Sequence, residues 1–330
     1  DLPLMNLSYR QWSEATIAAS HVEPRASLAK TWHADLATLD AESAAIELDA
    51  VKVAEHFTAY LAKCREDDVA LSSLLPGRFL MPGDFAGSPL LTFAPLTART
   101  HDEFPKGSLG DLMERRYDSY VSKIVRPFFF SHFARLDRQI VLVDALSALN
   151  AGPAAVQDLK NALTQVLACF RLGANSIFST FLGRRIDRIL FAATKADLLH
   201  QTSHDRLENI LRLIIEDASA KAEFSGATID VAALAAIRAT REAKVKQKGE
   251  ELPCIAGMPQ KGEKIGGTIF DGESEVAIFP GDLPANSLDA LDGTLRGKLK
   301  FVRFRPPPLK EGAFPHIRLD RSLEFLLGDR

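Results

Sequence analysis

The chain has 330 residues, of which 46% are hydrophobic and 25% charged, and its 40 basic and 43 acidic side chains give a formal net charge of −3. This is the composition of a globular protein, and the length fits one large domain or about two. The slightly acidic balance argues against a general nucleic-acid binder, because such domains are strongly basic. No apolar run reaches the roughly 18 residues of a membrane span.

The three cysteines, Cys64, Cys169 and Cys254, are too few for a disulfide framework and lack the short spacing of a metal site. They favour a reducing compartment. The expected location is therefore cytoplasmic, with peripheral attachment to the inner membrane left open. The chain starts at Asp1 with neither an initiator Met nor a signal-like segment, so we expect it to be a piece of something longer.

A helical region is predicted for residues 1–75. Segment 8–20 contains no Gly or Pro, and Pro24 suits the start of a second helix. Between residues 41 and 65, apolar side chains recur at helical spacing. The following stretch, 74–91, is rich in Pro and Gly but strongly apolar, which predicts an ordered, buried connector.

A second helix is predicted to begin at Ser108, where Asp111 completes a variant of the capping box. Pro127 is expected to end or kink this helix. The aromatic segment Phe128 to Phe133 follows and is a candidate interaction surface. Its His132 fits a satisfied core or interface histidine better than a catalytic base.

The middle of the chain alternates between short apolar runs and longer amphipathic segments. The predicted elements are a strand at 139–144, a helix at 153–172, a strand at 188–194, a helix at 203–224 and a strand at 229–237. This β-α-β-α-β order is the signature of a parallel α/β sheet.

The last part of the chain, 247–330, changes character, because Gly, Pro and short alternating runs predict a β-rich extension. Asp271-Gly272 is a hairpin turn signal. The run 301–305 is predicted to be a further strand, and an amphipathic helix at 318–329 closes the chain.

The most informative motif is Thr194-Lys195-Ala196-Asp197, at the carboxyl end of the second predicted strand. It fits the [NT]KxD element with which P-loop GTPases read guanine. The Asp accepts hydrogen bonds from guanine N1–H and the exocyclic amine, the Lys stem lies against the base, and the first residue ties the loop to the phosphate loop. Ligands of open α/β sheets bind beyond the carboxyl ends of strands, where this motif falls. The alternative is a polar loop in which Asp197 caps a helix.

The next predicted strand runs into Arg238-Ala239-Thr240. In the same geometry, the backbone N–H of Ala239 is the candidate for contacting the base, and an ordinary strand-to-helix turn is the alternative. The predicted base-binding residues are Thr194, Lys195, Asp197, Arg238, Ala239 and Thr240.

Phosphate ligands are not recognisable in the sequence. A phosphate loop reads GxxxxGK[ST], and no such stretch occurs in the 330 residues. Gly266-Gly267-Thr268 lacks the Lys and the preceding strand. We therefore assign no catalytic residue.

Histidines His200 and His204 have the i, i+4 spacing of two metal ligands on one helix face. The predicted helix cap Thr202 lies between them, and no neighbouring Cys or acid completes a set. A polar helix start is the simpler interpretation, so no metal site is predicted.

Other polar residues allow weaker assignments. Asp144 ends a strand and would either serve a magnesium-bound water or, more simply, cap the following turn. The arginines Arg184, Arg185 and Arg188 would meet phosphate or form a solvated basic edge. A hydrolase triad has no support, since no G-x-S-x-G elbow exists.

Long phrases of the sequence resemble the YcjX family of P-loop NTP-binding proteins, found in bacteria. They are PGRFLMPGDFAGSPLLTFAPL (76–96), RPFFFSHFARLDRQIVLVDALSALNAGP (126–153), LFAATKAD (190–197), HDRL (204–207), ALAAIRATREA (233–243), FPGDLP (279–284) and PHIRLDRSLEFLLGD (315–329). The resemblance implies a P-loop NTPase-like α/β fold with a mostly parallel sheet. The GTPase-like nucleotide-binding domain would occupy 76–246 with a helical insertion, and the extension 247–330 would pack on it. Thr194, Lys195 and Asp197 would be the base-reading element.

Some segments that are typical of the family do not occur in this sequence. Members of the family begin with a strand, a phosphate loop of the type G-x-S-x-x-G-K-T and a D-Y-P-G-E-W phrase similar to a GTPase switch. The opening DLPLMNLSYRQWSE looks like the continuation directly after that phrase. We therefore expect GTP or GDP and Mg²⁺ to bind only together with that segment, and the chain alone to be inactive.

Two functions are compatible with the sequence. The first is a GTP-preferring nucleoside triphosphatase, in which Asp197 reads guanine and the segment outside this chain supports Mg²⁺-assisted hydrolysis of the γ-phosphate. The second is a non-catalytic, stress-related scaffold with a nucleotide-fold remnant. The expected partners are a guanine nucleotide and another protein, with membrane association left open.

Overall fold

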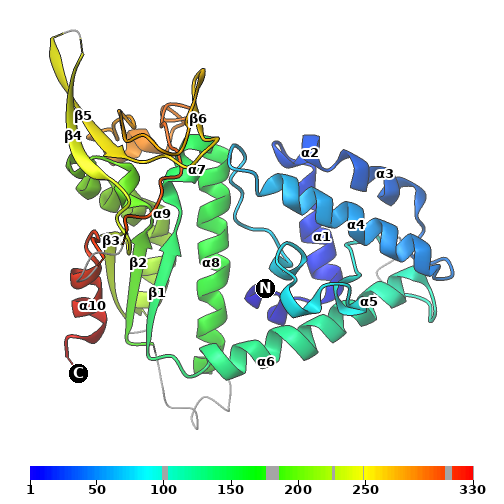
Figure 1. The fold of residues 1–330 in the computed structure, drawn as a ribbon. Helices are drawn as coiled ribbons and strands as arrows, with labels where there is room; N and C mark the ends of the chain where they lie inside the picture. The colour runs from blue at the N-terminus through cyan, green and yellow to red at the C-terminus, as the bar shows by residue number, and fades with distance from the viewer. Residues whose placement is uncertain (99–102, 176–185, 225–226, 248, 309–313, 330) are drawn as a thin grey trace. The chain divides into compact units, whose positions relative to one another are not determined.

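The computed structural model describes residues 1–98, 103–175, 186–224, 227–247, 249–308 and 314–329. The chain forms two compact units, coloured by residue number in Figure 1. Unit 1 comprises Asp1–Leu136 and Asn161–Gly183, and unit 2 comprises Asp137–Lys160 and Arg184–Arg330. The boundaries at 75/76 and 246/247 that the sequence suggests stay predictions.

Unit 1 is built from helices. They are α1 (Tyr9–Ser20), α2 (Arg25–Leu28), α3 (Lys30–Thr38), α4 (Glu47–Cys64), α5 (Leu109–Tyr120) and α6 (Arg126–Phe128). Ser8 begins α1 with a full capping box, because its Oγ accepts from the Gln11 N–H while the Gln11 side chain accepts from the Ser8 N–H. The helices expected at both ends of this region are thus confirmed. The connector 74–91 forms short 3₁₀ turns and is only partly buried: Phe79 is buried, whereas Met81 is exposed.

Aromatic side chains dominate the core of unit 1. Trp12 is 2% exposed and contacts the rings of Phe57, Phe93 and Tyr117, the last in a stacked arrangement with 5.2 Å between centroids. The Tyr117 hydroxyl donates to the Leu7 carbonyl at 2.8 Å, so the buried polar end of this ring is satisfied. Large rings that are fully removed from water make this core the main source of stability of unit 1.

Pro127 does not end the helix in which it lies, so of the two outcomes that the sequence left open, an end or a kink, the first is excluded. Arg126, the residue before it, has helical angles (φ −63°, ψ −48°). The helix continues because π-helical turns at Val121–Val125 and Phe129–Phe133 flank the short segment α6. A π turn shifts the backbone hydrogen bonds to i→i+5, which accommodates the missing N–H of proline.

Unit 2 contains the parallel sheet that the sequence predicts. Its strands β1 (Arg138–Val143), β2 (Arg188–Ala193) and β3 (Thr228–Ala233) lie in the order β1-β2-β3. Helices α7 (Ala145–Ala151) and α8 (Pro153–Asn175) follow β1 in the chain, and α9 (His204–Phe224) connects β2 to β3. Residues of α8 from Asn161 onward belong to unit 1. The strands end in register, with Val143 opposite Ala193 and Ala193 opposite Ala233. The third strand is shorter than expected, since the chain leaves the sheet at Leu234.

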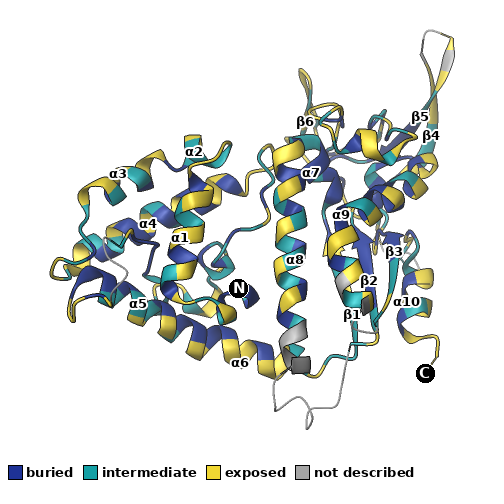
Figure 2. Cartoon of the chain, turned by 180° about the vertical axis from the view of Figure 1, so that it is seen from behind, coloured by how far each residue is buried: buried dark blue, intermediate teal, exposed yellow. Residues whose placement is uncertain are grey.

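The sheet is covered unevenly. Buried positions concentrate along β2 and the end of β3 (Figure 2). Helix α9 packs on β3 and β2, and the C-terminal helix α10 (Leu319–Leu327) places Leu326 against Leu190 and Ala232. By contrast, Ile140 and Leu142 on β1 are exposed, and within the described residues β1 pairs only with β2.

A smaller antiparallel sheet follows β3, in the order β4-β5-β8. Its strands are β4 (Arg241–Gln247), β5 (Glu250–Gly257) and β8 (Val276–Ile278), while β6 (Lys264–Ile265) and β7 (Thr268–Ile269) form a separate hairpin. These strands confirm that the C-terminal part contains β structure.

Two details of this region differ from the predictions. The hairpin turn lies at Gly266-Gly267 between β6 and β7, not at Asp271-Gly272. The Asp271 carboxylate instead accepts from the N–H groups of Glu273 and Ser274, which forms a local turn of its own. Residues 301–305 do not form a strand, because Phe304 makes only an isolated bridge to Pro259.

Helix α8 has 23 residues but carries Asp158, Lys160 and Arg171. Among the helices in the described ranges, none is both long enough and apolar enough to cross a membrane.

Candidate functional site

The predicted base-binding residues lie where the three parallel strands end. Strand β1 leads into Asp144, β2 leads into the segment 194–197, and β3 leads into the loop 234–240. Because the strands are parallel and in register, these three segments meet at one edge of the sheet.

Thr194 fastens the end of β2 to the end of β1. Its backbone N–H donates to the Val143 carbonyl at 2.9 Å, and its hydroxyl donates to the same oxygen at 3.2 Å. A Thr at this position therefore holds two strand ends together through both its backbone and its side chain. Its expected contact with a phosphate loop stays a prediction.

Lys195 has a left-handed backbone, with φ 62° and ψ 29°. This conformation costs a non-glycine residue about 1–2 kcal/mol. Its Nζ lies 2.6 Å from Oδ2 of Asp144, and its carbonyl accepts from the Leu198 N–H at 2.9 Å. Residues held in such strained conformations cluster at functional sites, because the surrounding structure must fix them.

Asp144 caps α7, as the simpler interpretation of the sequence expects. Oδ1 accepts from the Ser147 N–H at 3.1 Å, while Oδ2 accepts from the Ser147 hydroxyl at 2.9 Å and from Lys195. Both carboxylate oxygens are thus engaged. A metal-bound water at Asp144 would have to replace these contacts.

Asp197 is 9% exposed and faces the loop after β3. Its Oδ2 accepts from the backbone N–H of Ala239 at 3.0 Å, and its carbonyl accepts from the Thr240 hydroxyl at 2.5 Å. Burial is the main influence on the side chain and raises the pKa of the Asp197 carboxyl above its ordinary value. Asp197 does not cap α9, which begins at His204.

The two groups expected to read a base are therefore hydrogen-bonded to each other. The Asp197 carboxylate is an acceptor, and the Ala239 N–H directly beside it is a donor. A ligand that offers neighbouring N–H groups and an adjacent carbonyl oxygen would replace this mutual hydrogen bond and satisfy both groups. Guanine has that pattern in N2–H, N1–H and O6, whereas adenine cannot donate from N1.

Arg238 lies in the same loop, but its side chain turns to Glu242. One terminal nitrogen of the guanidinium is 2.6 Å from Oε1 of Glu242, and the backbone N–H of Arg238 donates to the Pro315 carbonyl at 2.6 Å. The other Glu242 oxygen faces Nε2 of His200 at 3.1 Å. Glu242 thus connects the loop after β3 to the segment after Asp197, and sequence reasoning did not single it out.

Histidines His200 and His204 point to different partners. His200 contacts Glu242 and Thr202, whereas Nε2 of His204 lies 2.9 Å from the carbonyl oxygen of Ala196. Burial is the main influence on His204 and lowers the pKa of its ring. A carbonyl oxygen can only accept, so Nε2–H is the donor in this contact. Across the described ranges no group of three metal-binding side chains occurs. His204 instead holds the backbone between Lys195 and Asp197.

Gly257, at the end of β5, lies against the candidate base loop. A Cβ atom at this position would lie 3.0 Å from the Ala239 carbonyl oxygen and 2.8 Å from the Phe304 ring. The absence of a side chain lets β5 approach the loop that holds Ala239. This contact comes from tertiary structure and left no signal in the sequence.

Arg188 is the first residue of β2, at the opposite end of that strand from this edge. Arg188 binds the Phe325 carbonyl and Asp329 rather than forming a solvated edge, and Arg184 and Arg185 lie outside the described residues. His132 is exposed, with its ring centroid 5.0 Å from that of Phe128, so it is not a core histidine.

Comparison with known proteins places the chain in a family. The model of the YcjX-like family, DUF463, matches residues 1–330. The chain is 34% identical to a protein named Ras-like GTPase YcjX from Escherichia coli (strain K12), over 337 aligned residues that cover 100% of this chain and 70% of that protein. It is 31% identical to a protein of the same name from Shewanella oneidensis, over 344 aligned residues that cover 100% of this chain and 68% of the relative. The chain therefore belongs to the YcjX-like family.

Proposed function

We propose that this chain carries the base-binding side of a guanine-nucleotide site. The observation that supports this most directly is the 3.0 Å contact between Asp197 and the Ala239 N–H at the carboxyl edge of a parallel sheet. In the complex, Asp197 accepts from guanine N1–H and the exocyclic amine, and the Ala239 N–H donates to O6. The name of the two relatives, Ras-like GTPase, supports the same assignment.

The neighbouring residues position these two groups. Thr240 holds the Asp197 carbonyl, Thr194 fixes the start of the loop, and the Lys195 stem lies along the base. Arg238, tied to Glu242, keeps the loop after β3 in place. In this proposal β1, β2 and β3 are part of a P-loop NTPase-like sheet.

Among the described residues, no group of three His, Cys, Asp or Glu side chains could hold Mg²⁺. Asp144, the carboxylate at the end of β1, is engaged by Ser147 and Lys195. We therefore place GTP hydrolysis in the full-length gene product and derive no step of it from these residues. Bound Mg²⁺ would supply charge stabilisation at the phosphates.

Base selectivity tests the proposal. The full-length gene product is titrated with GDP, IDP and ADP in the presence of Mg²⁺ by isothermal calorimetry. IDP lacks the exocyclic amine, so a carboxylate oxygen loses its donor and binding should weaken about tenfold or more. ADP also lacks N1–H and should bind about 100-fold or more weakly than GDP. Equal affinity for GDP and ADP would contradict the assignment of Asp197.

Gly257 offers a second test, because it lies against the Ala239 carbonyl in the loop after β3. In Gly257→Ala the new methyl group presses on the Ala239 carbonyl and the Phe304 ring, so GDP affinity should fall about tenfold through displacement of Ala239. Gly267→Ala is the matched control, since nothing lies within 4 Å of its added Cβ. The same titration measures both variants, and an unchanged affinity in Gly257→Ala would show that this contact does not control the loop.

A partner-binding function without catalysis is the second candidate. Phe128 and Phe130 are 42% and 58% exposed on the helix around Pro127, and exposed aromatic rings are typical of protein contacts. The absence of binding of GDP, IDP and ADP in the titration above would favour this candidate.

A further inference from the structure

The C-terminal segment is attached to the loop that carries Ala239. Ile317 and Ala235 exchange two backbone hydrogen bonds, of 2.8 and 3.2 Å, and the Pro315 carbonyl accepts from Arg238. Residues about 80 positions apart in the chain therefore form a short bridge in the loop after β3, just before Ala239. The antiparallel strands β4, β5 and β8 lie between these two segments in sequence.

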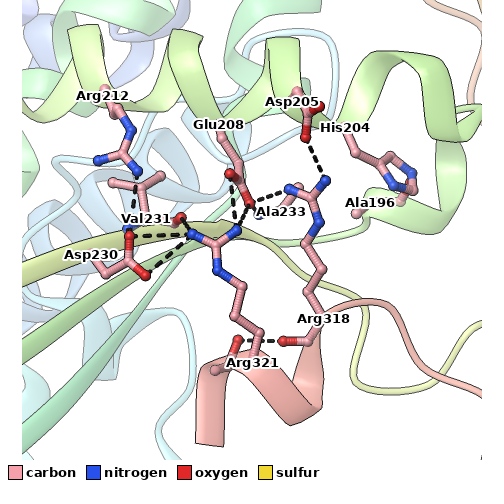
Figure 3. Close-up of polar contacts among 11 residues, drawn as sticks. Ala196, His204, Asp205, Glu208, Arg212, Asp230, Val231, Ala233, Arg318 and Arg321 are labelled. Carbon is pink, nitrogen blue, oxygen red and sulfur yellow. Dashed lines mark hydrogen bonds and ion pairs between the residues drawn. The ribbon is translucent and has the colours of Figure 1, made fainter. Parts of the chain in front are cut away.

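Glu208 of α9 is the centre of this attachment (Figure 3). Its Oε1 accepts from the backbone N–H of Ala233 at 2.9 Å and from the guanidinium of Arg318, with Arg321 at 3.3 Å. The Glu208 side chain is only 10% exposed. A buried carboxylate needs such compensation, and removing one partner leaves an uncompensated charge. This distinguishes Glu208 from an exposed ion pair, which contributes little.

Arg318 connects the bridge to Glu208. Its backbone is left-handed, with φ 55°, directly after Ile317 and directly before α10. This turn lets Ile317 pair with the chain after β3 while the Arg318 side chain reaches Glu208 and, at 2.6 Å, Asp205. The Ile317 backbone thus holds Ala235 directly, and the Arg318 side chain holds Ala233 through Glu208.

Leu234, which lies between Ala233 and Ala235, is hydrogen-bonded to the motif after β2. The Leu234 carbonyl accepts from the N–H of Ala196 at 3.2 Å, and the Leu234 N–H donates to the Ala193 carbonyl at 2.8 Å. Ala196 lies between Lys195 and Asp197. A displacement of the end of β3 would therefore move the backbone on which Asp197 stands as well as the loop that carries Ala239.

We propose that Glu208 and Arg318 are positioning residues of the nucleotide-base site. They fix the end of β3, from which both the Asp197 segment and the Ala239 loop take their position. The inference rests on the proposed function for the identity of the ligand, whereas the positioning itself is measurable without any ligand.

Hydrogen–deuterium exchange on the ligand-free full-length gene product tests the positioning. Arg318→Met keeps the length of the side chain and removes its charge, so the amides of Ala196 and Ala239 should exchange about tenfold faster or more, as expected for local opening. Arg188→Met is the matched control. Arg188 grips the other end of α10 through the Phe325 carbonyl and Asp329, so its loss should accelerate exchange only in the last turn of α10. Unchanged exchange at Ala196 and Ala239, or equal acceleration by the control, would overturn the proposal.

Titration with GDP and Mg²⁺ tests the consequence for binding. Arg318→Met should weaken GDP binding about five- to twentyfold, and Arg188→Met should leave it unchanged. Glu208→Gln keeps an acceptor for the Ala233 N–H and should have an intermediate effect; it also serves as the readout if Arg318→Met does not fold. Faster exchange with unchanged GDP affinity would overturn the role in binding. If the parent protein shows no guanine preference but the exchange pattern holds, the guanine assignment fails and the positioning stands.

Discussion

Replacing Asp197 with Asn should weaken GDP binding by the full-length gene product by about two orders of magnitude, the scale of losing hydrogen bonds to a charged group. Asn presents an N–H group where guanine also presents N–H groups. Xanthine carries a carbonyl oxygen in place of the exocyclic amine, so XDP should bind the variant more tightly than it binds the parent. Calorimetric titration with GDP and XDP measures both changes.

Asp144→Asn is the matched control, because Asp144 lies at the same sheet edge but contacts Lys195 and Ser147 rather than Ala239. Any change in its affinity through Lys195 acts on GDP and XDP alike, so its preference between these two nucleotides should stay that of the parent. A GDP affinity within threefold of the parent in Asp197→Asn would remove Asp197 from the base site.

Asp197→Asn should not lower the stability of the ligand-free protein, although it weakens GDP binding. Burial raises the pKa of the Asp197 carboxyl, so its ionised form costs stability above that pKa, and the cost disappears as the pH falls through it. Asn carries no charge and still offers an acceptor to the Ala239 N–H. At neutral pH, Asp197→Asn should therefore unfold at the same or a higher temperature than the parent in calorimetry, so weaker GDP binding would not reflect a damaged fold.

Trp12→Ala should lower the free energy of unfolding by about 3–5 kcal/mol, the range for removing a large aromatic ring from a core. Trp12 is 2% exposed and contacts four other aromatic rings of unit 1, those of Tyr9, Phe57, Phe93 and Tyr117. Urea denaturation followed by fluorescence measures the change, since the remaining tryptophan, Trp32, lies in the same core.

Trp12→Phe is the control for this change. Among the residues that the structure describes, none accepts a hydrogen bond from the indole N–H of Trp12, so Phe loses only ring volume and should cost far less than Ala. A cost below about 1 kcal/mol for Trp12→Ala would show that the aromatic cluster does not support unit 1.

Local sequence predicted the parts of the fold that local forces determine. The β-branched run at 139–143 and the apolar periodicity around Leu207 indicate a strand and a helix, and both are present. Pro127 left two outcomes open, an end or a kink, because proline lacks the backbone N–H that an α-helix uses, and the π turns that keep this helix continuous have no signal in the local sequence. Asp271-Gly272 misled because its turn residues serve a local loop rather than a strand pair.

The candidate site was predictable only where its residues are contiguous. Thr194 to Asp197 form a short motif directly after a strand, so the sequence alone points to them. Glu208, Glu242 and Gly257 take part through contacts between segments far apart in the chain, and a single sequence carries no record of such contacts. His204 drew attention through its spacing, but its partner is a backbone carbonyl, which no side-chain motif reveals.

Strand β1 carries a consequence for the behaviour of the isolated chain in solution. In the described part of the protein it pairs on one side only, and Ile140 and Leu142 are exposed on its surface. Unpaired N–H and C=O groups beside exposed aliphatic side chains form a template on which another extended chain can add. We therefore expect concentrated samples of residues 1–330 to associate edge to edge through β1.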